Sequence, residues 1–438
     1  METSDVTASV LDRIAELGIV GAGGAGFPTA VKLNARVPLV IVNGAECEPL
    51  LHKDKELMHH HAGAMLSGLR AAMELTGAAE GVIGVKNKYK DIIAELGAQA
   101  PAGIRVFPLS DSYPAGDEFI LVHDVTGKVI PPGGLPKDVG AVVANVETLI
   151  NIGNDRPVTH KYLTVAGAVA NPVTLRVPVG MSVGEVIAAA GGATAAQFEI
   201  LLGGVMMARL GRTDEPVTKT TGGIVVLPFD HPLVARYKGT WKHIERIGRS
   251  ACDQCRFCTE MCPRFLLGHP IEPHRAMQAL GFTGLKDAML AGTLYCCECN
   301  LCSMFACPED LDPKNVCVQA KPLAREKKLF WVGKPEDITP HPLGEARRIP
   351  TRRLKLKLGL DQFNDVGPLD ERALTPARVV VPLKQHAGAP AAAVVSPGDR
   401  VRVGDLLAAP AQGALGARIH SSIDGVVRSV DGSVVIEA

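Results

Sequence analysis

The sequence predicts an α/β domain, then a small β-rich module, a helical cysteine-rich domain and a compact all-β domain. Three observations support this fold class. Short apolar runs alternate with helix-like stretches in the first third of the chain, and ten of the eleven cysteines lie between Cys252 and Cys317. The tail from Arg378 consists of short β-branched runs broken by turn residues.

The composition sets limits on function. With 438 residues, 47% of them hydrophobic and 21% charged, the chain can bury the cores of several domains. Lys plus Arg number 46 and Asp plus Glu number 46, so no positive field favours a nucleic-acid partner. No apolar run reaches the length of a membrane helix, and Met1–Thr7 is acidic and polar, which predicts a cytoplasmic protein that is not integral to a membrane.

Residues 1–158 form the predicted α/β domain. Its apolar runs Leu39–Val42, Gly81–Val85 and Ile104–Leu109 are separated by glycine-rich turns and helical patterns. Residues 159–228 form the predicted β-rich module. This module has two strands joined by an Asn-Pro turn, and a helix is expected to begin near Ser182.

The remaining chain divides into three parts. Residues 229–331 carry most of the cysteines, and their apolar core would be small without metal. Residues 332–372 are predicted to be a solvated linker, because six basic residues lie between Arg347 and Lys357 among recurring prolines. Binding of an acidic partner is the alternative for this basic run. Residues 373–438 are the predicted all-β domain.

Two cysteine ladders indicate iron–sulfur clusters. The pattern C-x2-C-x2-C-x3-C-P begins at Cys252, and C-x2-C-x2-C-x4-C-P begins at Cys296. This is the spacing of two-cluster ferredoxins, in which the fourth cysteine of each run binds the other [4Fe–4S] cluster. We therefore assign Cys252, Cys255, Cys258 and Cys307 to the first cluster, and Cys296, Cys299, Cys302 and Cys262 to the second.

The alternative is a pair of zinc sites with four thiolates each. Zinc sites favour two separated C-x2-C pairs, whereas three thiols at three-residue steps followed by Cys-Pro suit a cluster. Three cysteines are not needed as ligands. Cys297 breaks the three-residue step, Cys317 lies on the apolar side of an expected helix, and Cys47 belongs to the first domain.

A glycine-rich loop spans Gly21–Thr29, with Lys32 about one helical turn later. Its small residues allow backbone N–H groups to approach a ligand, and a following helix start favours an anionic phosphate. The loop lacks the Gly-Lys-Ser/Thr of a Walker motif and the spacing of a dinucleotide fingerprint. A bare turn is the alternative, but so many glycines disfavour it.

The glycine loop, the stretch Asn43–Pro49 and the stretch Asn145–Leu149 together resemble the NADH-oxidising flavin subunit of respiratory complex I and the C subunit of Rnf complexes. The resemblance implies that this region binds FMN. Its implied FMN contacts are Gly21, Gly23, Gly24, Gly26, Lys32, Asn43, Glu46 and Asn145.

A second loop, Tyr113–Glu118, resembles the glycine–acid loop that lies near flavin and nicotinamide in these relatives. The cofactor-binding residues that it implies are Tyr113, Gly116, Asp117 and Glu118. Ala45 stands where the complex I proteins carry an acid, so the NADH side of the site departs from their pattern. The resemblance assigns cofactor contacts and names no catalytic residue.

The resemblance extends over most of the chain. Leu163–Pro172 is similar to the soluble-ligand-binding β-grasp (SLBB) module of these relatives, and Val381–Pro390 is similar to their barrel-sandwich hybrid domain. That domain stands first in the Rnf relatives and last here. The order flavin domain, β-grasp module, two-cluster ferredoxin-like domain and barrel-sandwich domain resembles the PduS-type cobalamin reductases of propanediol-utilisation microcompartments.

This resemblance implies electron transfer from NADH through FMN and two [4Fe–4S] clusters to cobalamin. The implied partners are a corrinoid or a corrinoid-handling enzyme such as an adenosyltransferase, and microcompartment shell or core enzymes. The alternative function is an electron-transfer adaptor of a microcompartment or Rnf-like complex that acts on a non-corrinoid acceptor. The cobalamin-binding string Asp-x-His-x-x-Gly is absent, which favours transient binding or delivery of the corrinoid.

Overall fold

Four parallel strands build the first sheet, in the order β3-β2-β1-β5. The computed structural model describes residues 2–282 and 286–438. The strands of this domain are β1 (Leu39–Gly44), β2 (Glu80–Lys86), β3 (Ile104–Leu109), β4 (Ser112–Tyr113) and β5 (Ala141–Asn145). Its helices are α1 (Glu2–Glu16), α2 (Thr29–Leu33), α3 (Lys53–His60), α4 (Ala62–Thr76), α5 (Lys90–Gln99), α6 (Glu118–Thr126), η1 (Pro136–Val139) and α7 (Val146–Asn154).

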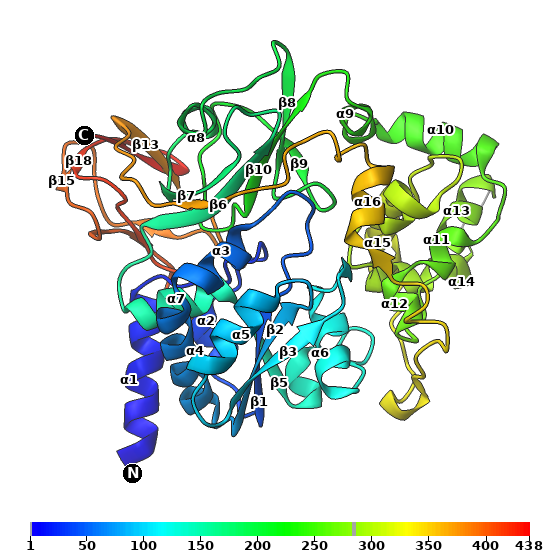
Figure 1. Cartoon of the computed structure of the whole chain (residues 1–438), viewed down its shortest axis with the longest axis horizontal. Coiled ribbons are helices and arrows are strands. Elements are labelled where there is room, and N and C mark those ends of the chain that lie inside the picture. The colour runs from blue at the N-terminus through cyan, green and yellow to red at the C-terminus, as the bar shows by residue number, and fades with distance from the viewer. Residues whose placement is uncertain (1, 283–285) are drawn as a thin grey trace.

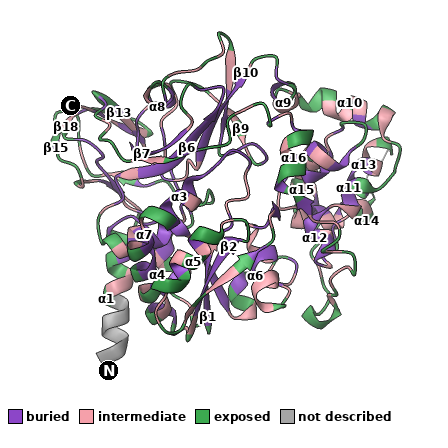
Figure 2. Ribbon diagram, in the orientation of Figure 1, coloured by how far each residue is buried: buried purple, intermediate pink, exposed green. Residues whose placement is uncertain are grey.

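Both faces of this sheet are covered by helices. Val40 and Val42 pack in one core with residues of α3, α4 and α7, whereas Leu39 and Ile41 pack in another with residues of α6. Figure 2 shows the strands of this sheet in the colour of buried residues. Strands buried on both faces are read in the sequence as continuous apolar runs, which is why these segments were predictable.

The second sheet has the order β12-β7-β6-β10-β8-β9 and lies above the first in Figure 1. Its strands from the β-rich module are β6 (His160–Gly167), β7 (Val173–Pro178), β8 (Phe198–Leu202), β9 (Arg209–Gly211) and β10 (Gly223–Pro228). Helix α8 (Val183–Ala189) begins where the sequence predicts, because the Ser182 side chain caps it and Glu185 closes the capping box.

The cysteine-rich domain lies at the right of Figure 1 and consists of short helices. They are α9 (Pro232–Tyr237), α10 (Trp241–Ala251), α11 (Phe257–Glu260), α12 (Pro263–Leu266), α13 (Pro273–Gly281), α14 (Asp287–Leu290), η2 (Ala291–Tyr295), η3 (Cys302–Ala306) and α15 (Pro313–Glu326). Its cores are small, and one of them contains Cys252, Cys296, Cys307 and Cys317. Across the described ranges, no helix is both long and apolar enough to cross a membrane.

Two small sheets form the C-terminal domain, in the orders β13-β19-β18-β15 and β14-β16-β17. Their strands are β13 (Arg378–Pro382), β14 (Ala392–Ala393), β15 (Arg400–Val401), β16 (Leu406–Ala409), β17 (Ile419–His420), β18 (Gly425–Val430) and β19 (Ser433–Glu437). The two sheets enclose one apolar core. This core also includes Val179 of the β-rich module, so the two domains pack against each other.

The prediction that residues 332–372 are a solvated linker is wrong. The segment contains η4 (Pro335–Asp337), β11 (Ile349–Pro350), α16 (Thr351–Lys357) and β12 (Leu369–Asp370). Strand β11 pairs with β4 of the first domain, and β12 pairs with β7 of the second sheet. We call residues 332–372 the strap, because they run back over three domains.

The composition of the strap hid its apolar side. Leu354 and Leu358 lie one helical turn apart and are buried in a core that also contains Tyr113 and Cys299. The basic residues are paired instead of solvated, since Arg347 binds Glu260 and Arg348 binds Asp124. Charge count alone therefore predicted the wrong environment.

The strap provides a matched test of this packing. Leu354 is fully buried, whereas Leu356 of the same helix is 53% exposed. We expect Leu354→Ala to reduce the free energy of unfolding by about 2–5 kcal/mol, because it leaves a cavity, and Leu356→Ala to change it little. Thermal unfolding and trypsin cleavage at Arg352 and Arg353 measure the difference. Equal effects of the two variants would show that the strap is not packed.

Candidate functional site

The glycine loop is a closed backbone turn at the carboxyl edge of the first sheet. A bridge between Val20 and Pro28 forms its base, and the Gly21 N–H donates to the Phe27 carbonyl oxygen at 2.9 Å. The Ala22 N–H donates to Thr148 Oγ1 at 2.9 Å, which fixes the loop to the first turn of α7. The loop therefore lies beside Asn145, at the end of β5.

A buried ion cluster supports this loop from below. Glu147 accepts hydrogen bonds from Lys53 Nζ at 3.1 Å and from the Tyr162 N–H at 2.9 Å, and it also pairs with Lys161. Lys161 Nζ donates to the Ala22 carbonyl oxygen at 3.0 Å. Burial alone would raise the pKa of Glu147, but the two ammonium groups hold it below its ordinary value.

The outer side of the loop is covered by the C-terminal domain. The Ala387 N–H donates to the Gly26 carbonyl oxygen at 3.0 Å, and a Cβ on Gly26 would lie 2.8 Å from Thr220 Cγ2. Gly26 is therefore required for this close approach. The His386 ring shares a hydrogen bond with the Ala417 carbonyl oxygen at 3.0 Å, so it serves as a packed turn residue of the same contact.

The inner side of the loop is open in the way that a bound FMN requires. Gly23, Gly24 and Ala25 are exposed, and a Cβ on Gly24 would meet no protein atom within 4 Å. Gly24 has φ +115°, which L side chains rarely adopt. A loop of bare backbone above free space, beside the Asn145 side chain, fits a phosphate-bearing ligand.

The other predicted FMN residues line the same edge of the sheet. Asn43 Nδ2 donates to the Gly116 carbonyl oxygen at 2.8 Å, which joins the end of β1 to the second loop. Lys32 Nζ and Glu118 Oε1 form an ion pair at 2.6 Å. The structure thus brings the glycine loop, Asn43 and the Tyr113–Glu118 loop together.

Two carboxyl groups of this region have special environments. Glu46 has φ +37° and accepts a hydrogen bond from the Lys55 N–H at 3.0 Å. Burial, with the nearby charge of Asp54, raises the pKa of Glu46 to about 8, which favours its neutral form at pH 7. Asp54 Oδ2 in turn accepts a hydrogen bond from Asn145 Nδ2 at 2.8 Å.

Asp117 differs from the expectation of a cofactor contact. One carboxylate oxygen caps α6 by accepting from the Phe119 and Ile120 N–H groups, and the other pairs with Arg264 Nη2 at 2.8 Å. Both oxygens are therefore used within the protein. Asp117 holds the second loop in place and connects it to the cysteine-rich domain.

The first cysteine set surrounds one cavity. Cys252, Cys255, Cys258 and Cys307 all line it, together with neighbouring residues of the same domain such as His274 and Leu311. The loop between them turns sharply, because Gln254 and Arg256 have φ of +59° and +67°. Cys255 is exposed, whereas Cys258 and Cys307 are buried.

The second cysteine set is also gathered. Burial raises the pKa of Cys302 well above its ordinary value, and the nearby thiolates of Cys296 and Cys262 raise it further. Cys299 is buried and close to Cys262 and Cys302. Two thiols that we did not assign as ligands adjoin this set, since Cys297 lies beside Cys299 and Cys317 beside Cys296.

The donor sets fit iron–sulfur clusters better than single ions. A zinc ion holds four sulfurs at about 2.3 Å each, which brings all of them close together. Among residues 2–282 and 286–438, no three metal-ligating side chains gather on that scale. Four thiols around a wider cavity suit a cubane cluster, whose positive irons would offset the cost of burying thiolates.

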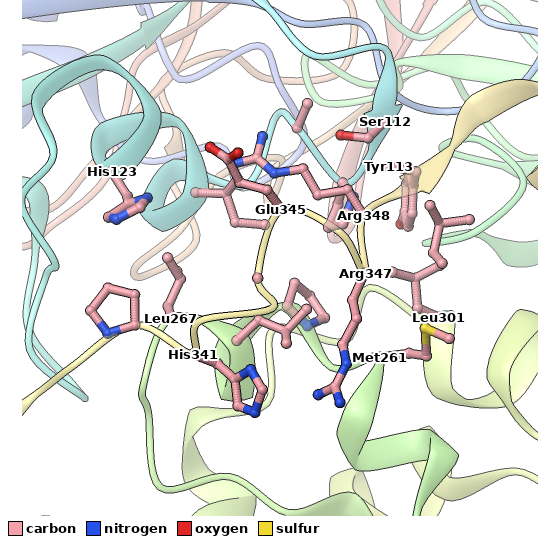
Figure 3. A pocket seen from close by; sticks show the side chains of 18 of the residues that line it. Ser112, Tyr113, His123, Met261, Leu267, Leu301, His341, Glu345, Arg347 and Arg348 are labelled. Atoms are coloured by element: carbon pink, nitrogen blue, oxygen red, sulfur yellow. The ribbon is translucent and has the colours of Figure 1, made fainter.

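A separate cavity of about 240 Å³ lies between the second loop, the cysteine-rich domain and the strap (Figure 3). Tyr113, Met261, Leu301 and His341 line it, and most of the other lining residues are apolar. Tyr113 is the only predicted cofactor-binding residue in this lining. The cavity therefore adjoins the candidate site and is distinct from the open space above Gly24.

Comparison with known proteins adds family assignments for four segments. Residues 14–154 match the Nuo51 FMN-binding domain, 162–210 the SLBB domain, 251–312 a 4Fe-4S dicluster domain and 369–438 the RnfC barrel sandwich hybrid domain. These matches confirm the predicted fold class. They also confirm FMN and two [4Fe–4S] clusters as the cofactors.

Several relatives are similar over long stretches. Cobalamin reductase PduS of Salmonella typhimurium is 43% identical over 438 residues, which cover 98% of this chain and 96% of that protein. The RnfC-type component of the Na⁺-translocating ferredoxin:NAD⁺ oxidoreductase complex of Acetobacterium woodii is 35% identical over 59% of each chain. A solved NAD⁺-reducing [NiFe]-hydrogenase is similar in fold, with a TM-score of 0.51, 20% identity and coverage of 78% of this chain and 64% of that one.

The open space above the glycine loop predicts a loss of flavin in Gly24→Val. The new side chain would enter this space and would also strain a backbone with φ +115°. Gly97→Val, at an exposed glycine of α5 with free space around it, is the control. FMN content and FMN affinity of the purified proteins are measured. Full flavin with normal affinity in Gly24→Val would refute the assignment of the loop.

The cysteine sets predict about eight irons per chain. We expect Cys255→Ser to lose one cluster and Cys317→Ser to lose none, because Cys255 lines the first cavity and Cys317 packs behind Cys296. Iron and sulfide analysis of anaerobically purified protein measures both. Loss of iron in Cys317→Ser, or zinc as the main metal, would show that the ligand set is wrong.

Proposed function

The chain belongs to the family of cobalamin reductase PduS, and from this we propose that it passes electrons from NADH through FMN and two [4Fe–4S] clusters to a corrinoid. One observation supports this function above the others. The flavin-type loop and both cysteine sets lie in one chain, and Tyr113 of the flavin region donates a hydrogen bond to the Cys299 carbonyl oxygen at 2.8 Å. A donor site and a one-electron carrier are thus in direct contact.

FMN, when bound, accepts the two electrons of a hydride and releases them singly, which connects a nicotinamide to one-electron clusters. The chain's own groups serve that chemistry by position. The backbone of Gly23 and Gly24 would bind the FMN phosphate, and Asn145 lies beside it. Asn43 and Lys32 hold the second loop against the site. The eight ladder cysteines would bind the clusters.

The acceptor proposal has a coarse and a fine part. The family supports a corrinoid as the acceptor and NADH as the donor. An adenosyltransferase that takes over the reduced corrinoid, and enclosure in a bacterial microcompartment, are finer proposals that rest on the family resemblance. Because the Asp-x-His-x-x-Gly string is absent, we propose that a partner enzyme presents the corrinoid.

Two activities should separate in Cys255→Ser, with FMN shown to be intact. A small dye such as ferricyanide can reach the flavin directly, so NADH-driven dye reduction should remain. Reduction of cob(II)alamin should be largely lost, since it requires the clusters. Both activities are measured side by side under anaerobic conditions, with Cys317→Ser as the control that keeps both.

Two outcomes would contradict the proposal. Undiminished cobalamin reduction in Cys255→Ser would show that reduced flavin acts on the corrinoid without the clusters. Loss of both activities to the same degree, in folded and flavin-replete protein, would exclude a path from flavin through clusters. If the wild-type protein reduces dyes and its own clusters but never a corrinoid, the adaptor function is favoured instead.

A further inference from the structure

The two cysteine sets differ in their contacts with the flavin region. Cys299 of the second set accepts the Tyr113 hydrogen bond through its backbone oxygen, and it shares one apolar core with Tyr113 and Leu50. Arg264, two residues after Cys262, pairs with Asp117 at 2.8 Å and stacks over the Phe119 ring at 3.5 Å. Both ends of the second set thus contact the Tyr113–Glu118 loop and the start of α6.

The first set lies away from the flavin region. The cavity that its four cysteines surround is lined by residues 252–258, 274, 277 and 307–313, all from the cysteine-rich domain. Residues 253–257 are all exposed, so only one thin loop separates this cavity from solvent. The first set is therefore placed at the surface of the molecule.

A buried carboxylate fixes the contact at the second set. Glu48 accepts hydrogen bonds from the N–H groups of Val205 at 2.8 Å, Met206 at 2.8 Å and Met207 at 3.1 Å. The Tyr113 hydroxyl also lies 3.4 Å from Glu48 Oε1. A Cβ on Gly204 would lie 2.5 Å from Glu48 Oε2, so this glycine permits the close approach.

The same loop holds the cysteine ladder. Asn300 Nδ2, next to Cys299 in sequence, donates to the Met206 carbonyl oxygen at 3.1 Å. The backbone of Tyr113 is held from the other side, because β4 pairs with β11 of the strap. The hydroxyl of Tyr113 is thereby aimed at Cys299 by three separate segments of the chain.

We propose that electrons enter the iron–sulfur domain through the second set (Cys262, Cys296, Cys299, Cys302) and leave through the first set (Cys252, Cys255, Cys258, Cys307). Tyr113 and Glu48 are positioning residues for the entry step. This order rests on the proposed function. The balance is one NADH and two molecules of a one-electron acceptor giving NAD⁺, one proton and two reduced acceptors, with the two electrons passing singly along the sets.

The order makes the two sets unequal toward the acceptor. An acceptor that docks on the exposed loop at residues 253–257 reaches the first set directly. The second set is buried between domains, because Cys299 and Cys302 are buried and Cys262 is buried. The exit is therefore at the surface around Cys255.

The experiment follows flavin and cluster reduction separately. Anaerobic protein, matched in FMN and iron content, is mixed with NADH, and flavin absorbance and the paramagnetic signal of reduced clusters are recorded over time. Tyr113→Phe should reduce its flavin at the wild-type rate but its clusters about two- to tenfold more slowly, in proportion to the loss of one hydrogen bond. Glu48→Ala should act similarly, and Glu48→Gln should restore part of the rate.

Tyr162→Phe is the matched control, since the Tyr162 hydroxyl donates to Glu371 at 2.7 Å and has no part in the contact. A second arm tests the order itself. Cys299→Ser, which keeps the first cluster, should not pass electrons from flavin to it, although dithionite reduces it. Cys255→Ser should still reduce its remaining cluster from flavin.

Wild-type cluster rates in Tyr113→Phe, or fast flavin-driven reduction of the first cluster in Cys299→Ser, would overturn the proposal. The same measurements are repeated with the flavin reduced by light instead of NADH. If NADH fails to reduce the wild-type flavin, the proposed function is wrong, and photoreduction still decides the order of the clusters. The two failures are therefore distinguishable.

Discussion

The buried carboxylate of Glu48 is the contact on which the arrangement of the domains depends. It comes from the first domain, binds three N–H groups of the β-rich module and lies beside the tyrosine that contacts the cysteine ladder. Each buried N–H group left without its partner would cost about 1–3 kcal/mol, so the three segments are held in one geometry. Transfer between fixed carriers requires such a geometry, because the carriers cannot search for each other.

The same principle applies to the glycine loop. Bare backbone is needed where a phosphate approaches, but a loop without side chains has nothing of its own to pack. The protein supplies support from outside the loop: Thr148 binds Ala22 N–H, Lys161 binds the Ala22 carbonyl oxygen, and Ala387 binds Gly26. Three domains thus hold one glycine-rich segment, which explains why the C-terminal domain lies beside the flavin region instead of apart from it.

Local patterns carried most of what could be predicted. The cysteine spacings, the glycine loop and the apolar strands of the first sheet are short segments whose chemistry or burial is written in adjacent residues. The supporting contacts are long-range and could not be read in this way. Glu48 and Val205 are 157 residues apart, Lys161 is a single ammonium in a strand, and the buried Leu354 and Leu358 of the strap are separated by basic residues. The quoted Asn-Val-Glu-Thr string was a signal for Glu147 and Thr148, but nothing local indicated their partners.

The account's central claim is spatial: the second cysteine set stands between the flavin and the first set. An experimental structure of the anaerobic protein, loaded with FMN and both clusters, tests it most directly. The account predicts the isoalloxazine ring in the space beside Gly24 and the Tyr113–Glu118 loop, with the cluster of Cys262, Cys296, Cys299 and Cys302 as the nearer of the two. A structure in which the cluster of Cys252, Cys255, Cys258 and Cys307 lies nearer the flavin would contradict it.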